Sequence, residues 1–251
     1  MPLSALAEPP PGAPPCNPRH DLIRLSTPLK HVARKLASGE PITIVALGSS
    51  STAGAGASSS LNSYPSQLAL ELQRHFPRHR IAVLNRGVNG EEVPEMLKRF
   101  DEAVTANKPD LLLWQMGTNS LIRDHAINDR GASIREGVDK ARAAGTDVVL
   151  IDPQFAPKVI AKPQVRNMVD FIAATAKRED VALFRRFEVM KEWSEVEHLP
   201  FSTFVIADGL HLNDWGYACM AKGLGMAIAE AAQRPVVSSK VVPTAHWEYA
   251  D

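Results

Sequence analysis

Short runs of apolar residues alternate along the chain with longer amphipathic stretches, and each run ends near a residue that is typical of turns. Runs of this length that are almost wholly apolar indicate strands covered on both faces, as in a parallel sheet. The pattern therefore restricts the chain to a sheet enclosed between two other layers. The expected strands cover residues 42–47, 81–84, 111–114, 147–151 and 181–184.

The stretches between these runs have the spacing of amphipathic helices. Within the first of them, Leu68, Leu72 and Phe76 recur every four residues. Alternation of strands and helices predicts a three-layer α/β domain. In open sheets of this kind, ligands bind beyond the carboxyl ends of the strands, so the chemistry is expected there. The expected helices cover residues 64–75, 94–106, 132–144, 164–177 and 214–232.

Composition excludes several classes of protein. The chain has 251 residues, of which 45% are apolar, enough to bury a core without metals or several disulfides. Lys plus Arg and Asp plus Glu both number 28, so the charge balance gives no support for a nucleic-acid partner or an anionic membrane surface. No run of 18 apolar residues is present, and we expect no membrane span. The oligomeric state stays open.

The chain divides into three parts. Residues 1–20 form a proline-rich segment, since 7 of the 19 prolines fall within residues 1–18. Residues 21–235 form the α/β domain, and 236–251 form a C-terminal tail without a clear period.

The proline-rich segment also bears on localisation. Ala5-Leu6-Ala7 has the small-x-small pattern at which signal peptidases cut. This layout favours a periplasmic or secreted protein over a cytoplasmic one with a proline-rich tail. The two cysteines, Cys16 and Cys219, could form one bridge if the protein is exported.

The loop after the first strand carries a cluster of hydroxyl groups, Gly48-Ser49-Ser50-Ser51-Thr52. It is not a phosphate-binding loop, because no lysine follows the glycines. It lacks the spacing of a dinucleotide fingerprint. It also lacks the Gly-x-Ser-x-Gly of an α/β-hydrolase elbow, since Thr52 stands where the last glycine would be. A flexible loop or a nucleophilic serine on a tight turn remain as interpretations.

Polar residues follow the other strands too. Gly87 lies in Asn85-Arg86-Gly87-Val88-Asn89-Gly90, and Asn119 follows Gly117 after the third strand. Asp208 and His211 are three apart on a turn before the last helix, where a carboxylate can fix the imidazole tautomer. Each feature alone is compatible with an ordinary turn or cap. Core packing does not require them in this order, and together they describe one site.

The sequence resembles the SGNH, or GDSL-type, serine hydrolases at these residues. The resemblance implies that Ser50 is the nucleophile, that Gly87 and Asn119 supply the oxyanion hole together with the Ser50 N–H, and that Asp208 and His211 complete a catalytic triad. All four blocks occur in order over residues 42–232. The family's fold is flavodoxin-like, with a five-stranded parallel sheet in the order 2-1-3-4-5.

Two positions depart from the family pattern. Ser49 replaces the aspartate before the nucleophile, and Ser120 replaces the aspartate after Asn119. Neither change removes a catalytic group, but both bear on the subfamily and on the rigidity of the two turns.

Asp152 and Gln154 follow the fourth strand and are predicted to line the substrate pocket, although a simple turn is an alternative. Asp152 is also a candidate for the triad acid. It ranks second to Asp208 because it lies far from His211 in sequence. The remaining histidines lack the spacing of metal ligands, so neither a metal nor another cofactor is expected.

The predicted activity is hydrolysis of short acyl esters, such as acetyl groups on a carbohydrate or a small molecule, through an acyl-enzyme. Two alternatives stay open. An O-acyltransferase would use the same site to acylate a sugar hydroxyl, and a non-catalytic carbohydrate-binding protein would share only the fold.

Overall fold

The computed structural model describes residues 13–125 and 130–235, and in it the five apolar runs form one parallel sheet with the strand order β2-β1-β3-β4-β5. Both the α/β class and the strand order confirm the prediction. The strands are β1 (Ile42–Gly48), β2 (Ile81–Gly87), β3 (Leu111–Gln115), β4 (Asp147–Ile151) and β5 (Ala182–Phe184).

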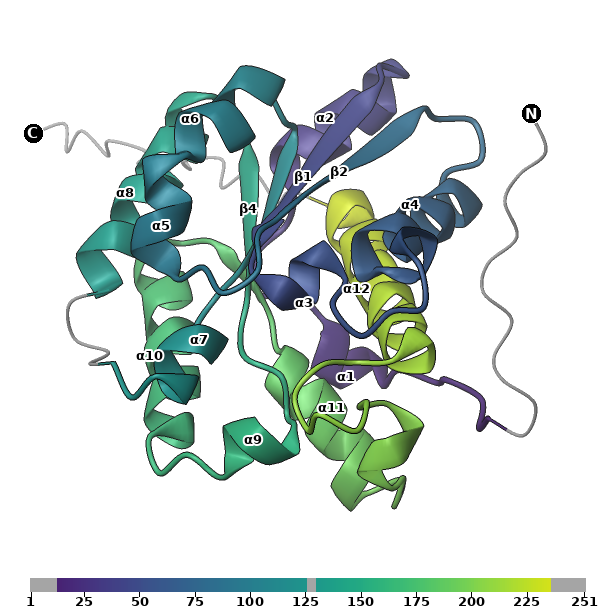
Figure 1. Cartoon of the computed structure of the whole chain (residues 1–251). Coiled ribbons are helices and arrows are strands. Elements are labelled where there is room, and N and C mark those ends of the chain that lie inside the picture. The colour runs from purple at the N-terminus through teal and green to yellow at the C-terminus, as the bar shows by residue number, and fades with distance from the viewer. Residues whose placement is uncertain (1–12, 126–129, 236–251) are drawn as a thin grey trace, which may run out of the picture.

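Helices cover both faces of this sheet (Figure 1). Helices α4 and α12 pack together on one face, and α5, α8 and α10 lie on the other. The helices are α1 (His20–Ile23), α2 (Lys30–Ser38), α3 (Ser50–Ala53), α4 (Tyr64–His75), α5 (Val93–Lys98), α6 (Phe100–Ala103), α7 (Thr118–Ile122), α8 (Arg130–Ala143), α9 (Pro157–Ile160), α10 (Val165–Arg178), α11 (Arg186–Glu195) and α12 (Asp214–Gln233). Short 3₁₀ turns η1 (Ser60–Asn62), η2 (Thr105–Asn107) and η3 (Phe201–Thr203) complete the described elements.

The central strands form the core. All side chains on β3 and all but the one at Thr43 on β1 and the one at Asp147 on β4 are buried. Trp114 on β3 packs edge-on against Phe100. This burial explains the near-continuous apolar runs, because helices cover both faces of a strand in the middle layer and neither face is exposed to water.

Helices α4, α8, α10 and α12 match the predicted ranges closely, but the helix expected over 94–106 is broken into α5, α6 and η2. The break is at Arg99, whose backbone leaves the helical region with φ −110° and ψ 13°. The Arg99 guanidinium reaches back to the Glu91 carboxylate and to the Arg86 carbonyl on β2. These tertiary contacts override the local helical preference.

The described part of the proline-rich segment lies against α12. Cys16 forms a disulfide with Cys219, the Trp215 indole N–H donates to the Pro14 carbonyl, and the Lys222 ammonium donates to the Cys16 carbonyl. The bridge that the sequence left open is therefore present. Residues 1–12 and the tail over 236–251 lie outside the described residues, so the three-part division of the chain stays a prediction.

Among the helices within the described ranges, none combines the length and the apolar character needed to cross a bilayer.

Candidate active site

Ser50 is the first residue of α3 and directly follows the tight turn at the end of β1. Gly48 permits this turn, because a Cβ at that position would stand 2.1 Å from the Thr52 hydroxyl and 2.8 Å from the Gln115 side-chain oxygen. That Gln115 oxygen accepts hydrogen bonds from the Ser49 backbone N–H (2.9 Å) and from its hydroxyl (3.0 Å). Ser49 thus braces the turn against the end of β3 although it replaces an aspartate.

The side chains of Ser50, His211 and Asp208 form one hydrogen-bonded chain. The Ser50 Oγ is 2.8 Å from His211 Nε2, and His211 Nδ1 is 2.6 Å from an Asp208 carboxylate oxygen. The His211 side chain is 18% exposed, which shields the imidazole but leaves it within reach of a substrate. An imidazole placed between a hydroxyl and a carboxylate can remove the hydroxyl proton and stabilise the charge it gains.

Asp208 is held in its ionised form. Partial burial raises the pKa of its carboxyl, but hydrogen bonds from the His211 ring and from the backbone N–H groups of His211 and Leu210 outweigh burial and lower that pKa overall. Because Oδ1 receives both backbone N–H groups, Oδ2 is left to face the imidazole.

The loop after α3 supports His211 from the other side. Gly56 has φ +91°, and a Cβ there would be 2.4 Å from the Leu212 carbonyl oxygen and 3.0 Å from the His211 Cβ. Ser58 donates its backbone N–H and its hydroxyl to the Asp214 carboxylate at the start of α12. The loop that follows α3 is therefore joined directly to the start of α12, the helix that follows His211.

Asn119 lies in α7, at the end of β3, and faces the same edge of the sheet. Its side-chain amide donates to the Glu91 carbonyl at 2.8 Å, which leaves the second amide hydrogen for a ligand. The neighbouring Ser120 donates its hydroxyl to the buried Glu92 carboxylate at 2.7 Å. This pair anchors the Asn119 turn without the aspartate that the family pattern has there.

Two side chains beyond Asn119 bind the same carboxylate. Arg123 (2.8 Å) and His125 (2.9 Å) both contact Glu92 Oε1. The buried Glu92 carboxylate thus has Ser120, Arg123 and His125 as partners. The sequence did not predict this cluster, because the three partners lie about 30 residues from Glu92 and the charge pattern does not indicate the contacts.

Gly87 has a packing role that differs from the predicted one. A Cβ at Gly87 would lie 2.1 Å from the Ala53 backbone nitrogen, so glycine lets α3 lie directly on β2. The Gly87 N–H donates to the Asn85 side-chain oxygen at 2.9 Å. With its N–H used in this way, Gly87 does not offer a free oxyanion donor in this structure.

Asp152 and Gln154 do not line an open pocket, which corrects the prediction. Their side chains are 0% and 1% exposed. They belong to a buried network with Arg186, which is also fully buried and donates to the Asp152 carbonyl and to Gln154 Oε1. Asp152 is also not the partner of His211, because Asp208 occupies that position. Arg186, the cation that organises the network, was not singled out from the sequence.

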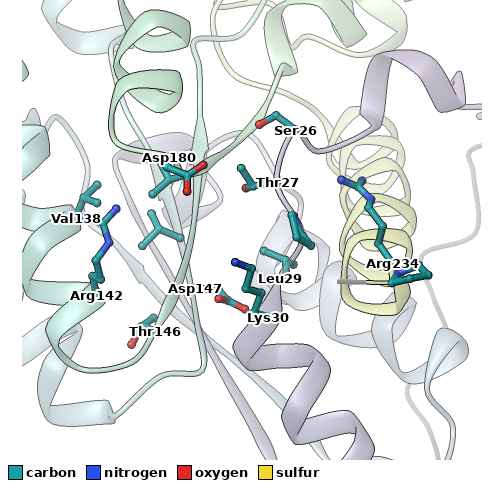
Figure 2. Close-up of a pocket in the computed structure, with 14 residues that line it drawn as sticks. Ser26, Thr27, Leu29, Lys30, Val138, Arg142, Thr146, Asp147, Asp180 and Arg234 are labelled. Atoms are coloured by element: carbon teal, nitrogen blue, oxygen red, sulfur yellow. The ribbon is translucent and has the colours of Figure 1, made fainter. Parts of the chain in front are cut away.

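A cavity of about 530 Å³ lies at the opposite, amino end of the sheet (Figure 2). Its wall combines cations such as Lys30, Arg142 and Arg234 with the carboxylates Asp147 and Asp180. No residue of the Ser50 site contributes to this cavity. Within residues 13–125 and 130–235, no three His, Cys, Asp or Glu side chains group as metal ligands would.

The chain is similar in sequence to known proteins. The profile of the Non-GDSL lipase-like family matches residues 15–234. An acetylxylan esterase from Geobacillus stearothermophilus is 22% identical over 206 residues, which cover 75% of this chain and 93% of that enzyme.

Solved structures show the same fold. A two-domain esterase active on acetylated mannans has a TM-score of 0.75 and 16% identity over 89% of this chain, and the chain spans only 59% of that protein. A serine-to-alanine catalytic mutant of the Geobacillus stearothermophilus acetylxylan esterase has a TM-score of 0.65 and 18% identity over 74% of this chain and 94% of the mutant's own. Structures described as catalytic mutants of that enzyme at an aspartate and at a histidine also match.

Proposed function

Because the chain belongs to the Non-GDSL lipase-like family, we propose that it is a serine esterase that removes acetyl or other short acyl groups from a carbohydrate. The observation that carries this proposal is the hydrogen-bonded chain from the Ser50 hydroxyl through His211 to Asp208 at the carboxyl edge of the sheet. The SGNH-type resemblance and the family match agree on an ester hydrolase, and the absence of an aspartate before Ser50 fits a non-GDSL branch.

The proposed reaction has two steps. The Ser50 Oγ attacks the ester carbonyl carbon while His211 Nε2 takes the hydroxyl proton, and His211 then donates that proton to the departing alcohol oxygen. In the second step His211 removes a proton from water, whose oxygen attacks the acyl carbon. The bond between that carbon and Ser50 Oγ then breaks, the acid leaves, and His211 returns the proton to Oγ. Asp208 keeps the Nδ1 proton facing it and stabilises the imidazolium in both steps.

The oxyanion of each tetrahedral intermediate needs preorganised donors. We assign this role to the Ser50 backbone N–H and to the second amide hydrogen of Asn119. For the third donor the geometry favours Gly90 over Gly87. Gly90 has φ +80° in the loop after β2 and adjoins Glu91, whose carbonyl binds the Asn119 amide, whereas the Gly87 N–H is engaged by Asn85.

The substrate class rests on the relatives. One relative is an acetylxylan esterase, and one protein of the same fold is an esterase active on acetylated mannans. We propose an acetylated polysaccharide as the substrate of this chain also. Ser50 and His211 are both partly exposed, so a polysaccharide can reach them from solvent.

Acetate release from acetylated xylan and acetylated mannan, together with a chain-length series of p-nitrophenyl esters, tests the proposal. We expect the highest kcat/KM for acetyl esters and none for Ser50→Ala, which removes only the nucleophilic oxygen. Labelling of Ser50 by a fluorophosphonate probe should disappear in the same variant. Full hydrolysis by Ser50→Ala would refute the assignment, and transfer to an added sugar in preference to water would favour the acyltransferase.

We also propose that the protein works in an oxidising compartment, as in the periplasm or outside the cell. The Cys16–Cys219 disulfide supports this, because such bonds are rare in reducing cytoplasm. Mass spectrometry of the natively expressed protein without reductant should find the two cysteines bonded and a mature start after residue 7. An intact Met1 with two free thiols would contradict the proposal.

A further inference from the structure

The side-chain amide of Gln154 connects two loops of the candidate active site. Gln154 follows β4 and is 1% exposed. Its Oε1 accepts a hydrogen bond from the Thr118 hydroxyl (2.8 Å) and one from the Arg186 guanidinium (2.8 Å). Its Nε2 donates to the Leu210 carbonyl at 3.3 Å.

Each end of this bridge adjoins a group that the proposed reaction uses. Thr118 directly precedes Asn119, the side-chain donor assigned to the oxyanion. Leu210 directly precedes His211, and the N–H groups of both residues donate to Asp208. Gln154 therefore ties the oxyanion side of the site to its acid–base side, although no atom of Gln154 belongs to either.

Arg186 fixes which way the Gln154 amide points. A guanidinium can only donate and a carbonyl can only accept, so Oε1 has to face Arg186 and Nε2 has to face Leu210. Arg186 is itself immobilised, because it is fully buried and its Nε donates to the Asp152 carbonyl at 2.9 Å. The Asp152 carboxylate in turn accepts the Phe187 N–H, which fixes the start of α11 against the end of β4.

We propose that Gln154 is a positioning residue, oriented by the buried Arg186, that sets the spacing between the Asn119 amide and the His211 imidazole. This inference rests on the proposed ester hydrolysis and adds a role outside the triad and the oxyanion donors. Its physical basis is that the base and the oxyanion donor act on one tetrahedral centre, so a shift between them of about 1 Å can cost about 100-fold in rate. Substrate binding depends less on this spacing, so kcat should respond more than KM.

Gln154→Glu tests the bridge most selectively. A carboxylate still accepts from Thr118 and Arg186, but it places an oxygen instead of an N–H toward the Leu210 carbonyl. We expect kcat for p-nitrophenyl acetate to fall about 10- to 100-fold, with KM changed less than about twofold. The rate of fluorophosphonate labelling at Ser50 should fall in parallel, because labelling uses the same base and the same oxyanion donors.

Thr118→Val removes the other end of the bridge, and Thr146→Val is its matched control. Thr146 is also buried and its hydroxyl donates to one carbonyl, that of Pro109, at the amino end of the sheet. Both changes should lower the melting temperature similarly, whereas only Thr118→Val should lower kcat, by about 10-fold. If Gln154 acts on Asn119 through Thr118, the double variant Gln154→Glu/Thr118→Val should lose less than the product of the two single losses.

The outcomes separate the two proposals. An active wild type together with a folded, fully active Gln154→Glu protein would refute the role of Gln154 and leave the esterase intact. Equal activity of Thr118→Val and Thr146→Val would refute it as well, including in the case where Gln154→Glu does not fold. A wild type that neither hydrolyses esters nor takes the label at Ser50 would instead refute the esterase function.

Discussion

Asp208 shapes a loop and, in the proposed reaction, also orients the imidazole of His211. One of its oxygens holds the backbone N–H groups of Leu210 and His211, and the other faces the imidazole. Because these bonds keep the pKa of the carboxyl below its usual range, the group is ionised at neutral pH and available to an imidazolium. The spacing of three residues is what lets one carboxylate do both.

Asn119 allows a sharp prediction at the same scale. Asn119→Ala removes a donor whose free hydrogen is expected to bind only the tetrahedral intermediate. We predict a fall in kcat of about 100- to 1,000-fold, with a much smaller change in KM. Steady-state kinetics with p-nitrophenyl acetate measures both constants. A raised KM with an unchanged kcat would instead assign Asn119 to substrate binding.

At the scale of elements, the contact of α3 with β2 determines where Ser50, the proposed nucleophile, lies. Gly87→Ala would bring a Cβ within 2.1 Å of the Ala53 backbone nitrogen, and backbone cannot move aside as a side-chain tip can. We predict a loss of about 1–3 kcal/mol in the free energy of unfolding and a fall in activity, because α3 carries Ser50 with it.

The control for this change is Gly131→Ala on α8, where the nearest atom to a new Cβ is 3.5 Å away. That variant should be as stable as the wild type or more so, by up to about 1 kcal/mol, since alanine favours a helix. Urea denaturation of both proteins gives the comparison. Equal stability of the two variants would show that the close approach of α3 to Gly87 is not required.

The Asp152 carboxyl, at the junction of β4 and α11, makes the free energy of unfolding depend on pH. Burial raises the pKa of the Asp152 carboxyl to about 7, with nearby Arg186 opposing the shift, whereas an aspartate in an unfolded chain titrates near pH ~4. Between those values the folded protein holds a proton that the unfolded chain has released. The free energy of unfolding therefore decreases as pH rises through this range, by up to about 1.4 kcal/mol per pH unit from this group.

Asp152→Asn removes the titrating group, so its free energy of unfolding should lack this contribution. Urea denaturation at intervals from pH 4 to pH 7.5 measures the two slopes, and other titrating groups affect both proteins alike. The wild type should lose stability relative to the variant as pH rises. Parallel curves would mean that folding does not raise the pKa of the Asp152 carboxyl.

The same junction shows where the sequence alone reaches its limit. The strands were predictable because burial on both faces requires continuous apolar runs. Ser50 and Asn119 were predictable as site residues because they follow β1 and β3, whereas Asp208 and His211 lie on the turn before α12 and were assigned from the resemblance. Asp152 and Gln154 were expected at the pocket because they follow the fourth strand, at the edge of the sheet where ligands bind. Their burial depends on Arg186, whose contacts with them arise only when α11 packs against β4. The periodicity of the sequence does not indicate that Arg186 is the partner of these residues.

At the scale of the whole molecule, the two ends of the sheet differ in character. The carboxyl edge carries the Ser50 site, and the amino edge carries the cavity of about 530 Å³ with its mixed charges (Figure 2). On one face of the sheet, α12 joins distant parts of the chain: it packs on α4, begins beside the His211 loop and holds the proline-rich segment through Cys219. The stability of α12 therefore bears on the site as well as on the N-terminal segment.

The disulfide allows a prediction at this scale. It joins positions 203 residues apart, so it restricts the unfolded chain strongly, and Cys219 is buried in α12. Cys16→Ser/Cys219→Ser should lower the free energy of unfolding by about 2–5 kcal/mol, a loss that reduction of the wild type should reproduce. The kcat at 25 °C should stay within about twofold, because neither sulfur contacts Ser50, His211 or Asn119. Thermal denaturation with and without reductant, run beside the variant, measures this. If reductant shifts the wild type and the variant equally, the bridge does not stabilise the fold. If the variant loses kcat while fully folded, the proline-rich segment acts on the site itself.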